Sequence, residues 1–154
     1  MQVNIRKGNP ADIEAALDLV KELAVYEKAA GEVEVTVQEM RNWAFGDDKL
    51  FDFFVAEKQG EVIGMALYYY KYSTWKGKCI FLEDIVVRES ERCRGYGGLL
   101  FEAVRQVARE QKVKRLEWQV LAWNEPAIGF YKKYKAAFDN EWLNCKLTFD
   151  QLQF

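Results

Sequence analysis

Alternating and helically spaced apolar residues predict three elements in the first third of the chain. "QVNIRK", residues 2–7, alternates between apolar and polar positions and predicts a strand. Residues 9–27 open with a capping asparagine and a proline, and an apolar stripe at helical spacing follows, which predicts a helix. "TVQE" has the pattern of a capping box and predicts a shorter helix over residues 36–43.

The rest of the chain continues this mixture of strands and helices. The branched and aromatic run "CIFLEDIVV" predicts a central strand, and the spacing of "LLFEAVRQVAREQK" predicts a helix. No linker, repeat or low-complexity segment interrupts the pattern, so we expect one mixed α+β domain over residues 1–154, in the order β-α-α-β-β-β-α-β-α-β. The expected elements are two strands about a turn at 59–60 within 53–73, a strand at 79–87, a helix at 99–112, a strand at 115–123, a helix at 124–134 and a strand at 141–149.

Composition narrows the function classes. A net charge of -2 argues against a nucleic-acid binder, the opening "MQVNIRKGNP" has no apolar core of signal-peptide length, and no apolar run approaches the length of a membrane span. The three cysteines are far apart and odd in number, which does not fit a disulfide framework or a zinc site. We therefore expect a cytoplasmic protein without a metal, a nucleic-acid partner or a membrane partner.

The chain contains no histidine. A Ser-His-Asp triad, a Cys-His pair and a histidine-ligated metal are therefore excluded. Any proton transfer must use carboxylates, tyrosine, lysine, cysteine or water.

The glycine-rich turn "RCRGYGGLL", residues 92–100, lies between a predicted strand and a predicted helix. Leu100 stands where a dinucleotide fingerprint needs a small residue, and no Gly-Lys-Ser/Thr ends the loop. The free N–H groups of a first helical turn attract anions, and Arg92 and Arg94 add positive charge. The turn predicts either a phosphate-binding loop or a flexible connection.

Two motifs in this part of the chain resemble a known family. "RGYGGL" after "FLEDIVV" is similar to the acetyl-CoA pyrophosphate loop of GNAT N-acetyltransferases, Arg/Gln-x-x-Gly-x-Gly/Ala, with a departure at Leu99. "AWNEPAIGFYKK" resembles the Asn-x-x-Ala-x-x-Phe-Tyr segment of the same family. "KELAVYEK", "YYKYSTWKGK" and "WNEPAIGFYKK" are also similar to the diamine (spermidine/spermine-type) branch, with Lys135 replacing a common glycine.

The resemblance implies a GNAT fold, a mixed and mostly antiparallel central sheet flanked by helices, with acetyl-CoA as acetyl donor. It also implies a homodimer, which the aromatic-rich "ALYYY" would suit. The implied cofactor-binding residues are Ile85, Val86, Val87, Arg92, Arg94, Gly95, Tyr96, Gly97, Gly98, Leu99, Leu100, Asn124, Glu125, Pro126, Ala127 and Tyr131.

An alkylamine, whose pKa is about 10.4, must lose a proton before it attacks a thioester. Glu83 is the candidate base, acting through water; alternatively, Glu83 or Asp84 only faces solvent, since strand residues alternate faces. A bulge would let both reach the cleft. The resemblance implies Tyr131 as the acid for the departing thiolate and an N–H group within residues 85–87 for the developing oxyanion. Direct transfer in a ternary complex is expected.

Carboxylates and aromatic faces suit a cationic amine, so a diamine or polyamine-like acceptor is expected. An amino-acid analogue such as thialysine, a peptide N-terminus and a non-catalytic acetyl-CoA-binding module remain alternatives, as does another phosphorylated ligand at the glycine turn. The residues at or beside substrate positions of the diamine branch are Tyr26, Glu27, Glu83, Asp84, Glu117, Trp118 and Gln119.

Overall fold

The computed structural model describes residues 2–153 and divides the chain into two compact units, Met1–Gln119 and Val120–Phe154, which are described separately. The second unit holds the helix α4 (Glu125–Lys132) and a short 3₁₀ helix, η4 (Phe149–Leu152). The first unit contains β1 (Asn4–Lys7), η1 (Pro10–Asp12), α1 (Ile13–Tyr26), η2 (Ala30–Glu32), α2 (Val37–Phe45), β2 (Asp52–Lys58), β3 (Glu61–Ser73), β4 (Gly77–Val87), η3 (Glu89–Glu91), α3 (Tyr96–Glu110) and β5 (Leu116–Trp118).

The first unit is built on one five-stranded sheet in the order β1-β2-β3-β4-β5. The pairs from β1 to β4 are antiparallel, and β5 adds to β4 in parallel. The mixed, mostly antiparallel sheet expected from the sequence is therefore confirmed. The parallel addition follows from the connection, because α3 carries the chain back along the sheet before β5 begins.

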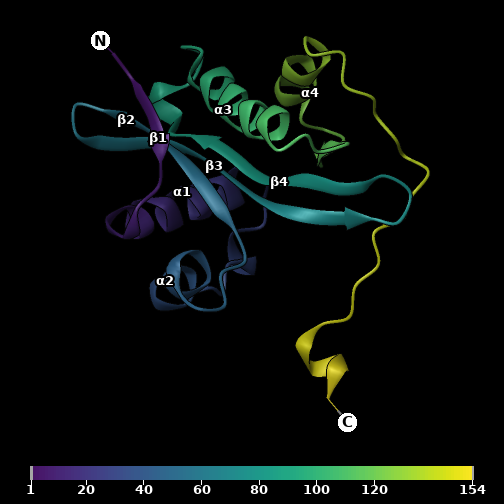
Figure 1. The fold of residues 1–154 in the computed structure, drawn as a ribbon. Coiled ribbons are helices and arrows are strands. Elements are labelled where there is room, and N and C mark those ends of the chain that lie inside the picture. Colours follow the sequence, from purple (N-terminus) through teal and green to yellow (C-terminus); the bar gives the residue numbers. More distant parts are fainter. Residues whose placement is uncertain (1, 154) are drawn as a thin grey trace. The chain divides into compact units, whose positions relative to one another are not determined.

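Helices cover both faces of this sheet (Figure 1): α1 and α2 lie on one side and α3 on the other. On the α1 side, Ile13 and Leu17 pack with the strand residues Met65, Leu67 and Val86 in one buried cluster. The α3 side buries the helix residues Leu100, Phe101 and Val104. The two faces of β3 and β4 thus meet different helices, which allows them to hold different side chains.

The predicted helix starts are confirmed by their hydrogen bonds. Asn9 accepts a hydrogen bond from the N–H of Ala11 at 3.0 Å, and its own N–H donates to the buried Asp12 at 2.8 Å. Thr36 and Glu39 form the reciprocal capping box at the start of α2. These bonds satisfy N–H groups that a helix start leaves without intrahelical partners.

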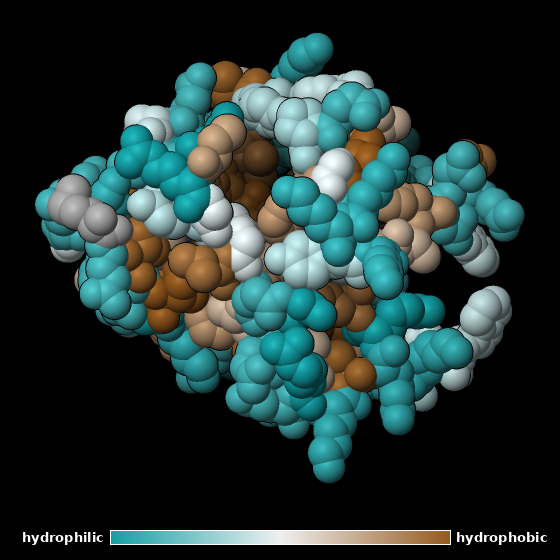
Figure 2. Space-filling view, turned by 90° about the horizontal axis from the view of Figure 1, so that it is seen from above, coloured by the Kyte–Doolittle hydropathy of each residue, from teal (hydrophilic) through white to brown (hydrophobic). Residues whose placement is uncertain are grey.

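The surface mixes polar and apolar side chains. Figure 2 shows one face of the molecule, on which hydrophilic side chains predominate and hydrophobic ones lie between them. In the first unit, exposed aromatic side chains gather at the turn between β3 and β4, where Tyr72 is 75% and Trp75 81% exposed.

Two sequence-based expectations about strands need correction. The strand expected at 115–123 is shorter, with β5 ending at Trp118. The strand expected at 141–149 is wrong, because residues 141–148 form no regular secondary structure and Phe149 begins η4. Trp142 and Leu143 are 74% and 87% exposed. Their apolar character favoured a strand, but a strand forms only where a neighbour pairs with its backbone.

A test of the packing between β3 and β4 is the variant Gly64→Ala. A Cβ at this position would lie 2.9 Å from the carbonyl oxygen of Val86 and 3.2 Å from Cδ1 of Leu100. We expect the variant to lose about 1–3 kcal/mol of unfolding free energy in urea titrations, because the strand and helix must shift. The matched control is Gly31→Ala, where nothing lies within 4 Å of the added Cβ; its unfolding free energy should be close to that of wild type. Equal losses of unfolding free energy in the two variants would contradict a steric clash at Gly64.

Candidate active site

A β-bulge in β4 carries the two predicted acidic residues. Leu67 of β3 pairs with Asp84, but the next residue, Tyr68, pairs with Leu82, so Glu83 is an extra residue without a partner in the ladder. The bulge changes the alternation of side chains at this point. The sequence left two alternatives open: a regular strand with the two carboxylates on opposite faces, or a bulge with both on one face. The structure has the bulge.

Both carboxylates lie on the α1 side of the sheet. Asp84 is two residues from Val86, whose side chain belongs to the cluster against α1, so the two share a face. Glu83 accepts a hydrogen bond at 2.9 Å from the hydroxyl of Tyr69, a β3 residue on the same face as Leu67. The bulge therefore brings Glu83 and Asp84 together instead of sending them to opposite faces.

Burial and neighbouring acidic groups raise the pKa of two carboxylates here, Asp84 and Glu27. Burial, and then the charges of Glu83 and Glu27, raise the pKa of Asp84 to about 7. Burial and Glu83 also raise the pKa of Glu27, which follows the last residue of α1. Burial and the bond to Glu83 raise the pKa of Tyr69 to about 12, so its hydroxyl stays a donor at neutral pH. A cationic ligand would relieve the repulsion among the three carboxylates.

Beyond the bulge, the edge of β4 is open on the side of β5. β5 pairs with β4 only from Ile80 to Leu82. The N–H of Arg88 donates to Ile63 of β3 at 2.8 Å, so by antiparallel alternation the N–H groups of Ile85 and Val87 point away from β3. These two groups can donate hydrogen bonds to a ligand lying along β4.

The glycine turn leads into the N-terminus of α3. Cys93 and Gly95 have positive φ values of 64° and 84°, and α3 begins at Tyr96 without a side-chain cap. A Cβ added at Gly97 would meet nothing within 4 Å, so its helical turn faces open space. Uncapped N–H groups beside an open glycine fit the pyrophosphate of a coenzyme A ester. The residues present therefore suit the expected donor.

The two arginines of the turn have different surroundings. Arg92 donates from Nε to the carbonyl of Val87 at 3.0 Å, and its guanidinium lies 5.2 Å from the ring of Tyr26 and 3.8 Å from Glu22. Arg92 thus ties the turn to β4 and α1. Arg94 is 53% exposed and pairs with Glu91 at 3.5 Å. Arg94 is the arginine of this turn with the greater freedom to meet a phosphate.

The remaining acceptor candidates of the first unit lie outside the acidic cluster. Glu117 is held by Lys71 and Arg115, at 3.2 and 2.9 Å, and these bonds lower its pKa despite partial burial. Trp118 packs edge-on against Phe101 of α3, with ring centroids 5.2 Å apart, and Gln119 is exposed just after β5. The structure thus groups Glu27, Glu83 and Asp84 but not these three residues.

The second predicted motif forms the start of α4 in the second unit. Asn124 caps this helix, accepting a hydrogen bond from the N–H of Ala127 at 3.4 Å, and Glu125 and Pro126 form its first turn. Tyr131 lies in the last turn, with its ring edge-on to Phe130 at 5.2 Å between centroids. Both prolines of the chain therefore stand at helix starts, as the sequence predicts.

Tyr69 is a direct partner of Glu83 that the sequence did not reveal. It is the middle residue of a run of three tyrosines, and alternation alone places it on the face opposite its neighbours. Its bond to Glu83 depends on the register of β3 against the bulge, which no local pattern encodes.

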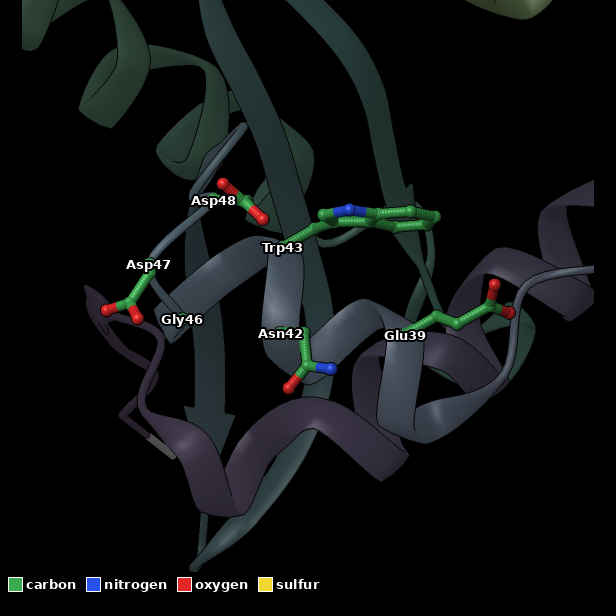
Figure 3. A pocket seen from close by; sticks show the side chains of 6 residues that line it. All are labelled: Glu39, Asn42, Trp43, Gly46, Asp47 and Asp48. Atoms are coloured by element: carbon green, nitrogen blue, oxygen red, sulfur yellow. The ribbon is translucent and has the colours of Figure 1, made fainter.

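A separate hollow borders α2 and the turn after it, and none of the predicted site residues lines it. Figure 3 shows its lining side chains, in which the carboxylates of Glu39 and Asp47 point away from each other. The lining residues are Glu39, Asn42, Trp43, Gly46, Asp47 and Asp48. Because the acidic groups do not converge, the hollow offers no arrangement for chemistry comparable with the bulge.

The sequence profile of the Acetyltransferase (GNAT) family matches residues 15–135. The chain belongs to the GNAT acetyltransferase family. GNAT acetyltransferases take their acetyl group from acetyl-CoA, and this chain is accordingly an acetyl-CoA-dependent N-acetyltransferase. Within the described residues 2–153, no helix of this GNAT protein is both long and apolar enough to cross a membrane.

Curated relatives of this GNAT chain include amine acetyltransferases. The thialysine N-epsilon-acetyltransferase of Bos taurus is 38% identical over 138 residues, covering 84% of this chain and 81% of the relative. The L-ornithine N5-acetyltransferase NATA1 of Arabidopsis thaliana is 37% identical over 122 residues, covering 79% of this chain and 50% of the relative. Human spermidine/spermine N(1)-acetyltransferase-like protein 1 is 30% identical, covering 82% of this chain and 19% of the relative.

Solved structures share the fold at low identity. The integron cassette protein VCH_CASS6 of V. cholerae superposes with a TM-score of 0.79 at 22% identity, covering 99% of this chain and 96% of the other. The aminoglycoside acetyltransferase HMB0005 from a soil metagenome has a TM-score of 0.78 at 17% identity, covering 96% and 100%. The GNAT fold expected from the sequence is therefore confirmed.

The raised pKa of Asp84 predicts a pH-dependent stability. The folded-state pKa of about 7 exceeds the ordinary 3.8, so protonated Asp84 contributes stability that is complete below about pH 4 and is lost as pH rises through about 7. Asp84→Asn stays neutral, and its melting temperature should exceed that of wild type increasingly from pH 4 to 7, with a constant difference above pH 8. Thermal unfolding across this range, with the exposed Asp48→Asn as control, measures it. If the difference in melting temperature between Asp84→Asn and wild type did not change with pH, the raised pKa of Asp84 would be contradicted.

Proposed function

We propose that the chain acetylates the primary amine of a small cationic acceptor. The observation that carries the proposal is the bulge, which sets Glu83 and Asp84 side by side next to the open edge of β4. Relatives named for thialysine, ornithine and spermidine/spermine all have small amine acceptors in their names. Three mutually repelling carboxylates attract an ammonium group, which supports a diamine, polyamine or amino-acid acceptor.

Glu83 is the proposed base. One of its oxygens accepts a hydrogen bond from the hydroxyl of Tyr69. The carboxylate is exposed and can take the proton of the acceptor's ammonium group through water. Tyr69 is a positioning residue in this scheme, because its bond restricts the rotation of the Glu83 side chain. Asp84 and Glu27 bind the cationic acceptor, while Tyr26 is tied to the arginine of the turn.

The proposed donor site uses the backbone of β4 and α3. Bound acetyl-CoA supplies an acetyl group as a thioester with a thiol leaving group. The outward N–H groups of Ile85 and Val87 hold the acetyl carbonyl oxygen, and the first turn of α3 with Arg94 holds the phosphates. Tyr131 is the proposed acid that protonates the leaving sulfur, since the chain has no histidine for the task.

Three further properties belong to the proposal. The two compact units form one catalytic domain, which is supported by the family profile running from residue 15 to residue 135 through both. The protein is cytoplasmic, which is supported by free thiols at Cys79, Cys93 and Cys145. It is a homodimer, and the exposed aromatic side chains at the β3–β4 turn support an interface there.

The role of Tyr131 is tested by Tyr131→Phe. We expect kcat for acetyl transfer to fall about 100-fold, because the leaving sulfur loses its proton donor, while the Kd for CoA stays unchanged. Free thiol released from acetyl-CoA is measured with putrescine, spermidine, lysine, thialysine and a short peptide as acceptors, and CoA binding is measured by calorimetry.

The control for this test is Tyr134→Phe, which removes a hydroxyl three residues further along the chain. It should retain wild-type kcat. Tight CoA binding without thiol release for any acceptor, in wild type as well, would contradict catalysis and favour a binding module.

The donor loop is tested by Gly97→Val. The Cβ of the added side chain would meet nothing within 4 Å, so we expect the fold to tolerate the valine, but its methyl groups occupy the volume proposed for the pyrophosphate. We expect the Kd for CoA to rise about tenfold or more, with a melting temperature near that of wild type. Unchanged CoA affinity in a folded variant would place the phosphates elsewhere.

A further inference from the structure

The sheet face that holds Glu83 continues as an unbroken row of side chains toward the β3–β4 turn. Tyr69, which bonds Glu83, has its ring centroid 5.5 Å from that of Phe81. The ammonium of Lys71 lies 5.5 Å from the same Phe81 ring. The row therefore begins at a carboxylate, crosses two aromatic rings and reaches a cation.

The far end of this row is positively charged. Glu117 of β5 accepts hydrogen bonds from Lys71 at 3.2 Å and from Arg115 at 2.9 Å. Two cations share one carboxylate, which leaves one net positive charge. The side chains of Lys71 and Arg115 are 45% and 39% exposed, and each group has more N–H donors than these bonds use. The cluster can therefore accept a further anionic oxygen.

The length of the row matches a particular acceptor. Glu83 is two residues from Phe81 along β4, and Phe81 pairs in register with Glu117 on the neighbouring β5. About 7 Å along the strand and about 5 Å across to the next one place the backbone of the two ends about 8 Å apart. In extended lysine, the ε-nitrogen and the carboxyl carbon are six bonds, or about 7.5 Å, apart. The methylene chain between them would lie on the rings of Tyr69 and Phe81.

We propose that Lys71 determines acceptor specificity by selecting a terminal amine that is joined to a carboxylate through a chain of lysine length. This rests on the proposed function, since Glu83 receives the reacting amine. Lys71 acts in two ways: with Arg115 it attracts the carboxylate, and it occupies Glu117, which would otherwise bind the second ammonium of a diamine. Linear diamines are therefore disfavoured.

The experiment compares lysine with 1,5-diaminopentane, which differs from lysine only by lacking the carboxylate. The affinity of each ligand is measured by calorimetry in the presence of CoA, and transfer from acetyl-CoA is measured separately. The variants are Lys71→Met and Lys71→Glu. The control is Lys78→Met, which removes one positive charge from the opposite face of the sheet. Lys78 donates a hydrogen bond to Gln111, and its ammonium lies over the ring of Tyr70. Tyr70 directly precedes Lys71 in β3, so the two side chains point to opposite faces.

We expect the native protein to bind lysine more tightly than 1,5-diaminopentane. Lys71→Met should raise the Kd of lysine about fivefold to tenfold and leave that of the diamine unchanged or lower, as loss of a partly exposed charge-assisted contact implies. Lys71→Glu should reverse the order of the two ligands, and Lys78→Met should change neither Kd.

Equal weakening of both ligands by Lys71→Met, or the same change in Lys78→Met, would overturn the proposal, as would a native protein that prefers the diamine or binds neither ligand. The binding data also separate the two proposals. If the Kd values change as expected but no acetyl is transferred, the specificity site is supported and the proposed transfer to amines is contradicted.

Discussion

The extra residue in β4 is the constraint on which the acidic end of the candidate site depends. In a regular strand Glu83 and Asp84 would face opposite helices, and one of them would be pressed toward the apolar surface of α3. The bulge between Leu67 and Tyr68 keeps the apolar residues of β4 in place on both sides while turning two adjacent carboxylates to one face. Packing on both faces of the sheet therefore fixes where the charge lies.

Carboxylates that lie close together repel one another, and in this sheet that repulsion is concentrated at the bulge of β4. Burial and the charges of Glu83 and Glu27 raise the pKa of Asp84, whereas Glu117 on the same sheet is neutralised by two cations and has a lowered pKa. A face with uncompensated negative charge at one end and a shared cation cluster at the other distinguishes ligands by the charge at each of their ends.

The donor side depends on the backbone instead of on side-chain charge. β5 stops at Trp118, so the outward N–H groups of β4 beyond the bulge are left for a ligand. The turn before α3 reaches its left-handed conformation at Gly95, which has no Cβ to oppose it, and Arg92 anchors the turn to Val87 and α1. Strand length and turn geometry together place the uncapped helix start.

The sequence by itself determined the helices, the three-stranded meander, the absence of histidine chemistry and both GNAT motifs, because caps, periodicity and motif spacing are local properties. It misjudged residues 141–149, where an apolar pattern found no strand to pair with. Tertiary structure alone decided the bulge register, the bond from Tyr69 to Glu83 and the ion pair between Lys71 and Glu117. The bonds from Tyr69 to Glu83 and from Lys71 to Glu117 join residues 14 and 46 positions apart, and the bulge depends on one skipped pairing; no local pattern encodes any of these.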